Sequence, residues 1–188
     1  MRQILVTLLF GCAALPALAC GPDTDCMVGE RSYRIVMPEG HDGSAPVPVI
    51  AYAHGYQGSS AGVMRNGSLR GLASDLGAAL IAFNSAGGSW ILPNHPRQMD
   101  SDGSGEFEYV DAVLEDATAR FPLDGTRIMA TGFSGGGMLI WNLACAQWQL
   151  CRLCAGVGYV LAEATQYLLC AGDEYRPHSR RCRQGGAA

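Results

Sequence analysis

The chain has 188 residues, of which 48% are hydrophobic and 16% are charged, and its formal net charge is −4. This length and composition are typical of one globular domain with a sizeable hydrophobic core, which excludes a disordered chain. The negative charge provides no basic surface for a polyanion, so nucleic acid and anionic membranes are not expected partners.

The first 19 residues have the features of a secretory signal peptide. Arg2 supplies a positive charge ahead of an apolar stretch, residues 4–14, that is too short to anchor in a bilayer. Residues 17–19 read Ala-Leu-Ala, a small-residue cleavage site, so Cys20 is expected to begin the mature chain. A lipid-modified Cys20 is the alternative, although Ala17 stands where such sites usually carry leucine. We therefore expect a secreted or periplasmic protein without a membrane span.

Eight cysteines fit an exported protein, because disulfides persist in oxidising compartments. Cys20 and Cys26 are close enough in sequence to close a small loop as a disulfide. Cys151 and Cys154 have the C-x-x-C spacing of zinc and redox sites, and a redox protein is an alternative function. The sequence has no second such pair and no histidine pair at metal spacing, so we predict no metal site.

From residue 31 onward, apolar runs alternate with helical patterns. They predict strands at 31–37, 47–53, 78–83 and 127–131, and helices at 60–76 and 107–121. Residues 84–104 form a long polar loop, and such a loop in a compact domain is usually functional. Buried strands that alternate with helices predict an α/β fold with a mostly parallel sheet and flanking helices.

The stretch Gly132-Phe133-Ser134-Gly135-Gly136-Gly137 follows the last of these strands and precedes an apolar helix start at residue 138. A strand, the pattern Gly-x-Ser-x-Gly and a helix form the nucleophile elbow of α/β-hydrolases. Gly132 and Gly136 are needed because the turn is tight and a Cβ would strike a neighbouring strand or helix. Ser134 is therefore the predicted nucleophile. A glycine-rich loop that happens to contain a serine is the alternative.

A serine nucleophile also needs hydrogen-bond donors for the oxyanion and a base to accept its proton. We assign one donor to the backbone N–H of Gly135 and the other to that of Tyr56, in the loop after strand 47–53. His54 is expected to shape this loop and not to act as the base. His54, Asn84 and Trp90 are the predicted substrate-binding residues. The alternative for His54 is a buried histidine at a strand end whose ring is satisfied by the backbone, and Asn84 and Trp90 could equally serve in packing or lie at the surface.

Five short motifs occur in order along the chain. They are Tyr-Ala-His-Gly-Tyr (52–56), Met-Arg-Asn-Gly-Ser (64–68), Tyr-Val-Asp-Ala-Val-Leu (109–114), Thr-Gly-Phe-Ser-Gly-Gly-Gly-Met (131–138) and Asn-Leu-Ala-Cys (142–145). In these motifs the chain resembles the secreted polyhydroxybutyrate depolymerase and feruloyl esterase family of α/β-hydrolases, over residues 20–150. The resemblance implies a serine esterase that acts on polyesters or on acylated carbohydrate and aromatic esters, without a metal or another cofactor.

That family places its catalytic acid in a His-Gly-x-x-Asp loop after the elbow and its histidine farther on. Asp173 and His178 have this order, but they lie close together in a tail without a strand–loop–helix frame. We therefore expect the fold to be incomplete at the C-terminus and the activity of the chain as written to be impaired. A non-catalytic polymer- or carbohydrate-binding remnant of the esterase scaffold is the alternative function.

The composition changes after residue 150, where arginine and cysteine become frequent and the apolar periodicity fades. Codons can be chosen for residues 178–188 so that a one-base shift reads Ile-His-Gly-Ala-Ala-Asp-Lys-Val-Val-Pro-Leu, which resembles the acid loop of the family. The same shift in residues 151–158 permits Ala-Gly-Phe-Ala-Pro-Val-Ser-Gly, which resembles its next strand. We therefore divide the chain into a signal peptide (1–19), a hydrolase core (20–150) and a tail (151–188) that a frameshift would explain. A divergent but genuine tail is the alternative, and the coding DNA decides between them.

Overall fold

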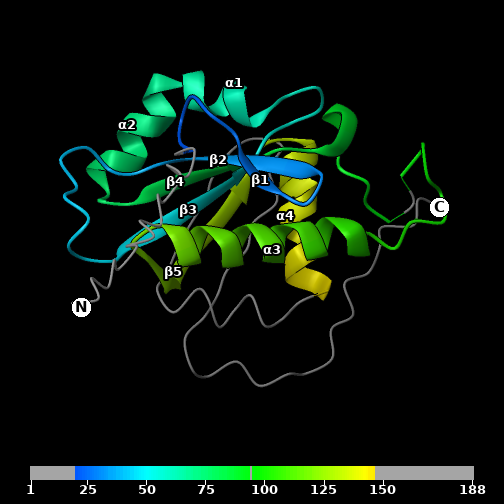
Figure 1. Ribbon diagram of the computed structural model, residues 1–188. Helices are drawn as coiled ribbons and strands as arrows, with labels where there is room; N and C mark the ends of the chain where they lie inside the picture. Colours follow the sequence, from blue (N-terminus) through cyan, green and yellow to red (C-terminus); the bar gives the residue numbers. More distant parts are fainter. Residues whose placement is uncertain (1–19, 94, 147–188) are drawn as a thin grey trace, which may run out of the picture.

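The computed structural model describes residues 20–93 and 95–146, which fold into a sheet with helices on both faces (Figure 1). The strands are β1 (Cys26–Val28), β2 (Arg31–Val36), β3 (Val47–Ala53), β4 (Ala79–Phe83) and β5 (Leu123–Gly132). The helices are α1 (Ser60–Arg65), α2 (Gly67–Asp75), α3 (Ser104–Arg120) and α4 (Gly135–Ala146), and a 3₁₀ turn, η1, spans Ala86–Gly88. The predicted signal peptide, the C-x-x-C pair, Asp173 and His178 lie outside the described residues.

The described strands pair in the order β1-β2-β4-β3-β5. Strands β4, β3 and β5 are parallel, whereas β1 and β2 form an antiparallel ribbon that pairs antiparallel to β4. The predicted α/β fold with a mostly parallel sheet is thus confirmed, with this ribbon added at one edge. Ala53 pairs with Gly132 at the ends of β3 and β5. The loops that follow these two strands therefore leave the sheet side by side.

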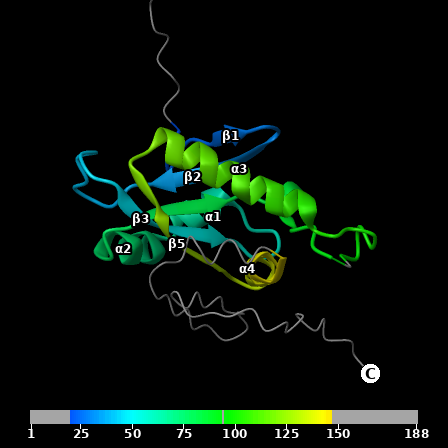
Figure 2. The ribbon, with the colours of Figure 1, turned by 90° about the horizontal axis from the view of Figure 1, so that it is seen from below.

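Alternate residues of β3 enter two hydrophobic cores on opposite faces of the sheet, as the two-residue period of a strand requires. Val49 and Ala51 pack in the larger core with residues of α3 and α4. Ile50 packs in the smaller core with residues of α1 and α2. Figure 2 shows the strands between α3 on one side and α2 on the other.

The largest differences between predicted and observed boundaries occur at three places. The single helix expected at 60–76 is two helices, because Asn66 has an extended backbone and its side-chain oxygen accepts a hydrogen bond from Leu69 N at 3.1 Å, which caps α2. Helix α3 begins at Ser104 instead of residue 107, and β5 begins at Leu123 instead of residue 127. The early start of α3 brings Glu106 into its first turn, where this side chain is buried.

The predicted disulfide between Cys20 and Cys26 is confirmed, with Cα atoms 4.9 Å apart. It ties the beginning of the described chain to β1, whose residue Cys26 is itself buried in the larger core. A six-residue separation closes a short loop, so the bond mainly orders this local segment.

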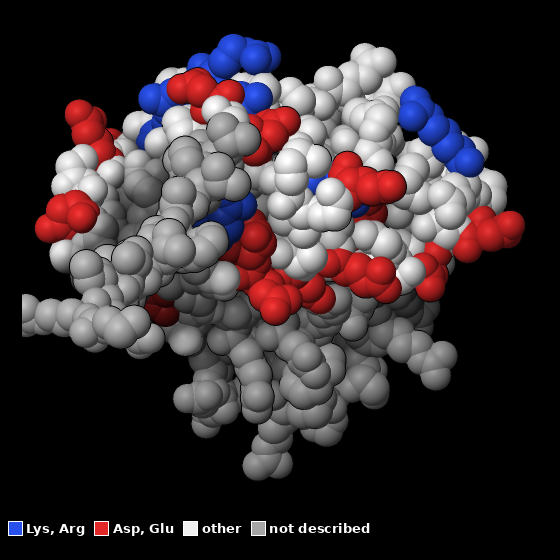
Figure 3. Space-filling model, in the orientation of Figure 1, with Lys and Arg blue, Asp and Glu red and all other residues white. Residues whose placement is uncertain are grey.

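The exposed side of α3 carries acidic side chains, among them Glu108, Asp111 and Glu115. In Figure 3 acidic side chains gather across the face of the molecule over this helix. Across the described part of the chain, none of the helices combines the length and apolar character that crossing a bilayer would require.

Candidate active site

Ser134 lies in the turn between β5 and α4, where the sequence predicted the elbow. β5 ends at Gly132 and α4 begins at Gly135. The backbone φ of Ser134 is 51°, in the left-handed region that side chains other than glycine rarely adopt. This conformation leaves the residue exposed at the carboxyl edge of the sheet. The local geometry is therefore that of a nucleophile elbow.

Two glycines let the elbow approach the neighbouring strand. A Cβ on Gly132 would lie 2.5 Å from the carbonyl carbon of Gly136. A Cβ on Gly136 would overlap the carbonyl oxygen of Ala53 and lie 2.6 Å from that of His54. The obstacles are backbone atoms that side-chain rotation cannot remove. Only glycine fits at either position, so the spacing of the motif follows from the close contact with β3.

The loop after β3, residues 54–57, faces the elbow and is named here the oxyanion loop for its predicted role. An ideal Cβ built on Gly135 would lie 3.9 Å from the backbone nitrogen of Tyr56, so the two predicted donors belong to adjacent segments. Gly135 opens α4, and the N–H groups of a first helical turn have no intrahelical acceptor. Within the described residues, the backbone N–H of Tyr56 forms no hydrogen bond. The structure thus places the two N–H groups on adjacent segments, and their role as oxyanion donors stays a prediction.

His54 is buried and both of its ring nitrogens have partners. Nδ1 lies 2.7 Å from the carbonyl oxygen of Gly55, and Nε2 accepts a hydrogen bond from Ser85 N at 3.2 Å. These bonds place the proton on Nδ1 and keep the ring neutral. Burial lowers the pKa of His54, and the nearby Arg31 charge acts in the same direction. The ring therefore links its own loop to the chain at Ser85.

The other two predicted substrate-binding residues also bond within the protein. Trp90 is 3% exposed, and its indole N–H donates to the carbonyl oxygen of His54 at 2.7 Å. The Asn84 amide accepts a hydrogen bond from Ser60 N and donates one to Ser32 Oγ, which links α1 and β2 to the end of β4. These contacts are typical of residues that support the structure around a site. We propose that both residues position other groups and do not contact the substrate.

None of the described histidines hydrogen-bonds to Ser134. His41 bonds within its own turn, to Ala45 O and Gly43 N. His95 bonds to Ser89 Oγ and Arg97 N. Across residues 20–93 and 95–146, no group of three or more His, Cys, Asp or Glu residues is arranged to hold a metal ion.

A buried ion pair between Glu106 and Arg31 was not predicted from the sequence. Glu106 is 3% exposed, and its Oε2 lies 2.9 Å from Nη1 of Arg31. One signal was present in the sequence, because Glu106 shares a helical face with the apolar residues Val110 and Val113, at spacings of four and seven. An acidic residue in such a stripe indicates a buried charge with a partner.

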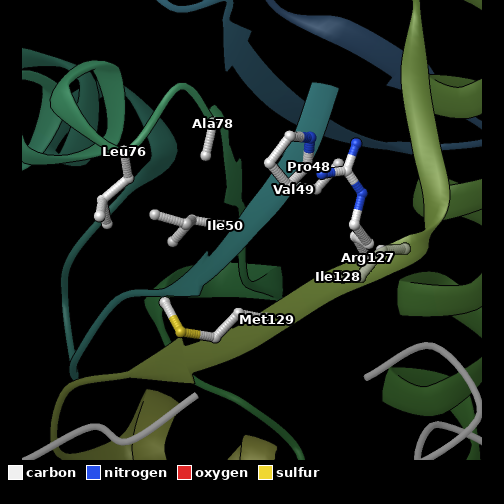
Figure 4. Close-up of a pocket in the computed structure, with 8 residues that line it drawn as sticks. All are labelled: Pro48, Val49, Ile50, Leu76, Ala78, Arg127, Ile128 and Met129. Carbon is white, nitrogen blue, oxygen red and sulfur yellow. The ribbon is translucent and has the colours of Figure 1, made fainter. Parts of the chain in front are cut away.

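A partly open, mostly apolar pocket of about 200 Å³ lies elsewhere. It is lined by residues 48–50 of β3, by the middle of β5 at residues 127–129, and by Leu76 and Ala78 after α2. In Figure 4 the side chains of Leu76, Ile50 and Met129 point into the same space. Ser134 and the oxyanion loop follow the opposite ends of these strands. The cavity is therefore separate from the candidate active site.

No family model matches the chain. A probable feruloyl esterase C from Aspergillus terreus is 30% identical over 142 residues, which are 73% of this chain and 48% of the fungal protein. A putative esterase, NocK, from Nocardia uniformis subsp. tsuyamanensis is 27% identical over 121 residues, or 61% of this chain and 33% of that protein. The chain thus spans half or less of the length of these relatives.

Among solved structures, an acetyl xylan esterase from Aspergillus awamori has a TM-score of 0.51 at 18% identity. The match covers 70% of this chain and 45% of that structure, and at this identity it supports the fold alone. The order of the strands and the geometry of the elbow are consistent with these similarities. Over the part that they share, the chain is thus similar in sequence to feruloyl esterase C, and its fold is similar to that of the acetyl xylan esterase.

Proposed function

We propose that the protein is a serine hydrolase of carboxylic esters, with Ser134 as the nucleophile. One observation carries the proposal. Ser134 has a left-handed backbone, with φ at 51°, in a turn where Gly135 lies against the backbone nitrogen of Tyr56. A strained serine beside two backbone N–H groups on adjacent segments is the kind of arrangement that acyl transfer uses.

The reaction follows from these positions. Ser134 Oγ attacks the acyl carbon, its proton passes to a base, and the N–H groups of Gly135 and Tyr56 bind the oxyanion. The C–O bond to the alcohol breaks as the base returns the proton to the leaving oxygen. Water then repeats these steps on the acyl-enzyme and releases the acid. The base and its carboxylate partner are His178 and Asp173 or, under the frameshift hypothesis, residues of the shifted frame.

The substrate proposed is an ester with an apolar or aromatic acyl group on a carbohydrate or a polyester. The names of the two Aspergillus proteins point to feruloyl and acetyl xylan esters, and polyhydroxybutyrate comes from the sequence resemblance alone. Tyr56, Phe133 and Met138 surround the elbow and are 59%, 53% and 55% exposed. Exposed large apolar side chains around a nucleophile suit an apolar acyl group.

Export from the cytoplasm is part of the proposal. The signal-peptide pattern of residues 1–19 would direct it, and cleavage would leave Cys20 at the mature N-terminus. The disulfide between Cys20 and Cys26 supports this, because such bonds persist in oxidising compartments. A polymeric substrate would also require an enzyme outside the cell.

A non-catalytic module that binds polymer or carbohydrate is the second candidate. The observation in its favour is that, among residues 20–93 and 95–146, no histidine hydrogen-bonds to Ser134. Such a module would keep the exposed apolar side chains and would not acylate its serine.

Ester cleavage by the full chain and by Ser134→Ala tests the proposal. With p-nitrophenyl acetate, we expect an acetyl adduct on Ser134 by intact mass and a faster release of p-nitrophenol than in Ser134→Ala. The difference is roughly 10⁴-fold if the tail supplies a working acid and base, and smaller if it supplies neither. Ser68→Ala is the matched control, since Ser68 is exposed on α2, and it should behave as the wild type. Equal rates in wild type and Ser134→Ala, without an adduct, would remove the esterase proposal. Retained binding to insoluble xylan or polyester would then favour the module.

A further inference from the structure

Trp90 connects the oxyanion loop to the elbow. Its indole N–H donates to the carbonyl oxygen of His54 at 2.7 Å, and its ring lies 5.0 Å from the His54 ring, centroid to centroid. Trp90 Cδ1, the ring atom next to this nitrogen, would be 3.7 Å from a Cβ built on Gly135. A displacement of this indole would therefore change the spacing of the two segments that hold the proposed oxyanion donors.

Glu106 fixes the backbone immediately after Trp90. Its Oε1 accepts a hydrogen bond from the backbone N–H of Ile91 at 2.9 Å. Its Oε2 pairs with Arg31, and the carboxylate is 3% exposed. A buried carboxylate persists only if it is paired and hydrogen-bonded. Oε2 of Glu106 has the ion pair but no hydrogen bond, so the hydrogen bond of the carboxylate is the one that Oε1 accepts from the chain beside Trp90.

Arg31 is held in turn by the end of β4 and by α3. Its Nη2 donates to the carbonyl oxygen of Asn84 at 3.0 Å, and its guanidinium carbon lies 3.5 Å from the ring centroid of Tyr109. The Tyr109 hydroxyl donates to Ser32 O at 2.6 Å and accepts from Asn84 N at 2.8 Å. Burial raises the pKa of Tyr109 to about 12, so the phenol remains a donor at neutral pH. The anchor of Glu106 is thus part of the sheet itself.

We propose that Glu106 is a positioning residue for the oxyanion site. It acts through Ile91 N–H and the Trp90 indole on the His54 carbonyl, and it thereby sets the Tyr56 N–H against the Gly135 N–H. This inference rests on the proposed esterase function. A purely structural reading gives Glu106 only an ion pair with Arg31, with no effect specific to acyl transfer.

Two substitutions of nearly equal size separate these readings. Glu106→Gln and Glu106→Met both remove the charge and leave Arg31 without its carboxylate, so this cost is common to both variants. Glutamine keeps an oxygen that accepts from Ile91 N–H, whereas methionine has no comparable acceptor. Positioning predicts that acylation of Ser134 is slower in Glu106→Met than in Glu106→Gln by about tenfold or more, because small misplacements of donors have large effects on rate.

The assay measures acylation of Ser134 in the full chain by p-nitrophenyl acetate, with kcat and KM determined separately. The loss in Glu106→Met is expected in kcat at nearly constant KM, and Glu106→Gln should restore most of it. Glu108→Gln, the same change at an exposed position on α3, should match the wild type. Equal kcat in Glu106→Gln and Glu106→Met would overturn the inference.

Trp90→Phe provides a second test of the inference if Glu106→Met does not fold. Phenylalanine keeps an aromatic ring under the loop and removes only the donor to His54 O, so kcat should again fall about tenfold. A wild-type kcat in Trp90→Phe would overturn the inference. If the wild type cleaves the ester no faster than Ser134→Ala does, the proposed function is wrong, and the inference that rests on it is wrong as well.

Discussion

The elbow and the oxyanion loop follow two adjacent parallel strands, yet they are held in place by opposite means. The elbow is shaped by missing side chains, since Gly132 and Gly136 allow its backbone to touch that of β3. The oxyanion loop is shaped by added side chains, since the His54 ring and the Trp90 indole tie it to more distant segments. Close backbone packing holds the first, and buried hydrogen bonds hold the second.

This difference determines how each region should respond to change. Backbone contacts leave no room for a methyl group, so the elbow should fail abruptly under small substitutions. Hydrogen bonds to a neutral histidine depend on its protonation, so the oxyanion loop should respond gradually to pH. We therefore expect a larger loss of stability from a methyl group at the contact between the elbow and β3 than from protonation of His54.

Gly136→Ala should produce the largest effect. The new Cβ would overlap the carbonyl oxygen of Ala53, and strands cannot shift without loss of sheet pairing. We expect the free energy of unfolding to fall by about 3 kcal/mol or more, or the soluble protein to be lost. Urea unfolding measures it. Near-wild-type stability would show that the elbow is not fixed by backbone contact.

Acidification should loosen the oxyanion loop. Because burial holds the pKa of His54 below its ordinary value of 6.5, the folded state binds fewer protons than the unfolded state as pH falls below that value. The contribution to stability is thus complete above about pH 6.5 and decreases as pH falls from there. Urea unfolding at about pH 7.5 and about pH 5.5 should show a smaller loss in His54→Gln than in the wild type.

His41→Gln is the control for this pH experiment, since the His41 ring hydrogen-bonds only within its own turn. It should reduce the pH-dependent loss less than His54→Gln does. An identical loss in wild type and His54→Gln would contradict the assignment of a neutral, buried imidazole that supports the oxyanion loop.

Gly135→Ala should have the smallest effect on stability. Its methyl group would meet Trp90 Cδ1 at 3.7 Å and Tyr56 N at 3.9 Å, which are ordinary contact distances. Stability should therefore change by no more than about 0.5 kcal/mol. Acylation of Ser134 should nevertheless fall about tenfold, because the methyl would crowd the space between the two proposed donors. Destabilisation equal to that of Gly136→Ala would erase the contrast between the two glycines.

The sequence predicted the elements whose pattern is local. The run 47–53 matches β3 at both ends, because a buried strand in a parallel sheet is a continuous apolar run. The break at Asn66 was missed, because the apolar spacing continues through it and only the capping bond of its side chain separates α1 from α2. The first four residues of β5 were missed because they include Asp124 and Gly125, which are typical of turns.

In the candidate site, too, the sequence predicted the local pattern but not the contacts between distant segments. Ser134 and its glycines could be identified because the elbow lies within six consecutive residues. The bonds of His54 reach Ser85 and Trp90, and those of Glu106 reach Arg31, so they depend on how distant segments meet in the fold. Residue type identified His54, Asn84 and Trp90 as notable, and only their partners indicate that they position other groups.

The left-handed backbone of Ser134 affects which residue type would be favoured at this position. An L-residue in that conformation costs roughly 1–2 kcal/mol relative to its preferred backbone, whereas glycine adopts it freely. Folding alone would therefore favour glycine at position 134. A serine at this point opposes the conformational preference of the chain, and its hydroxyl is the one property that glycine lacks.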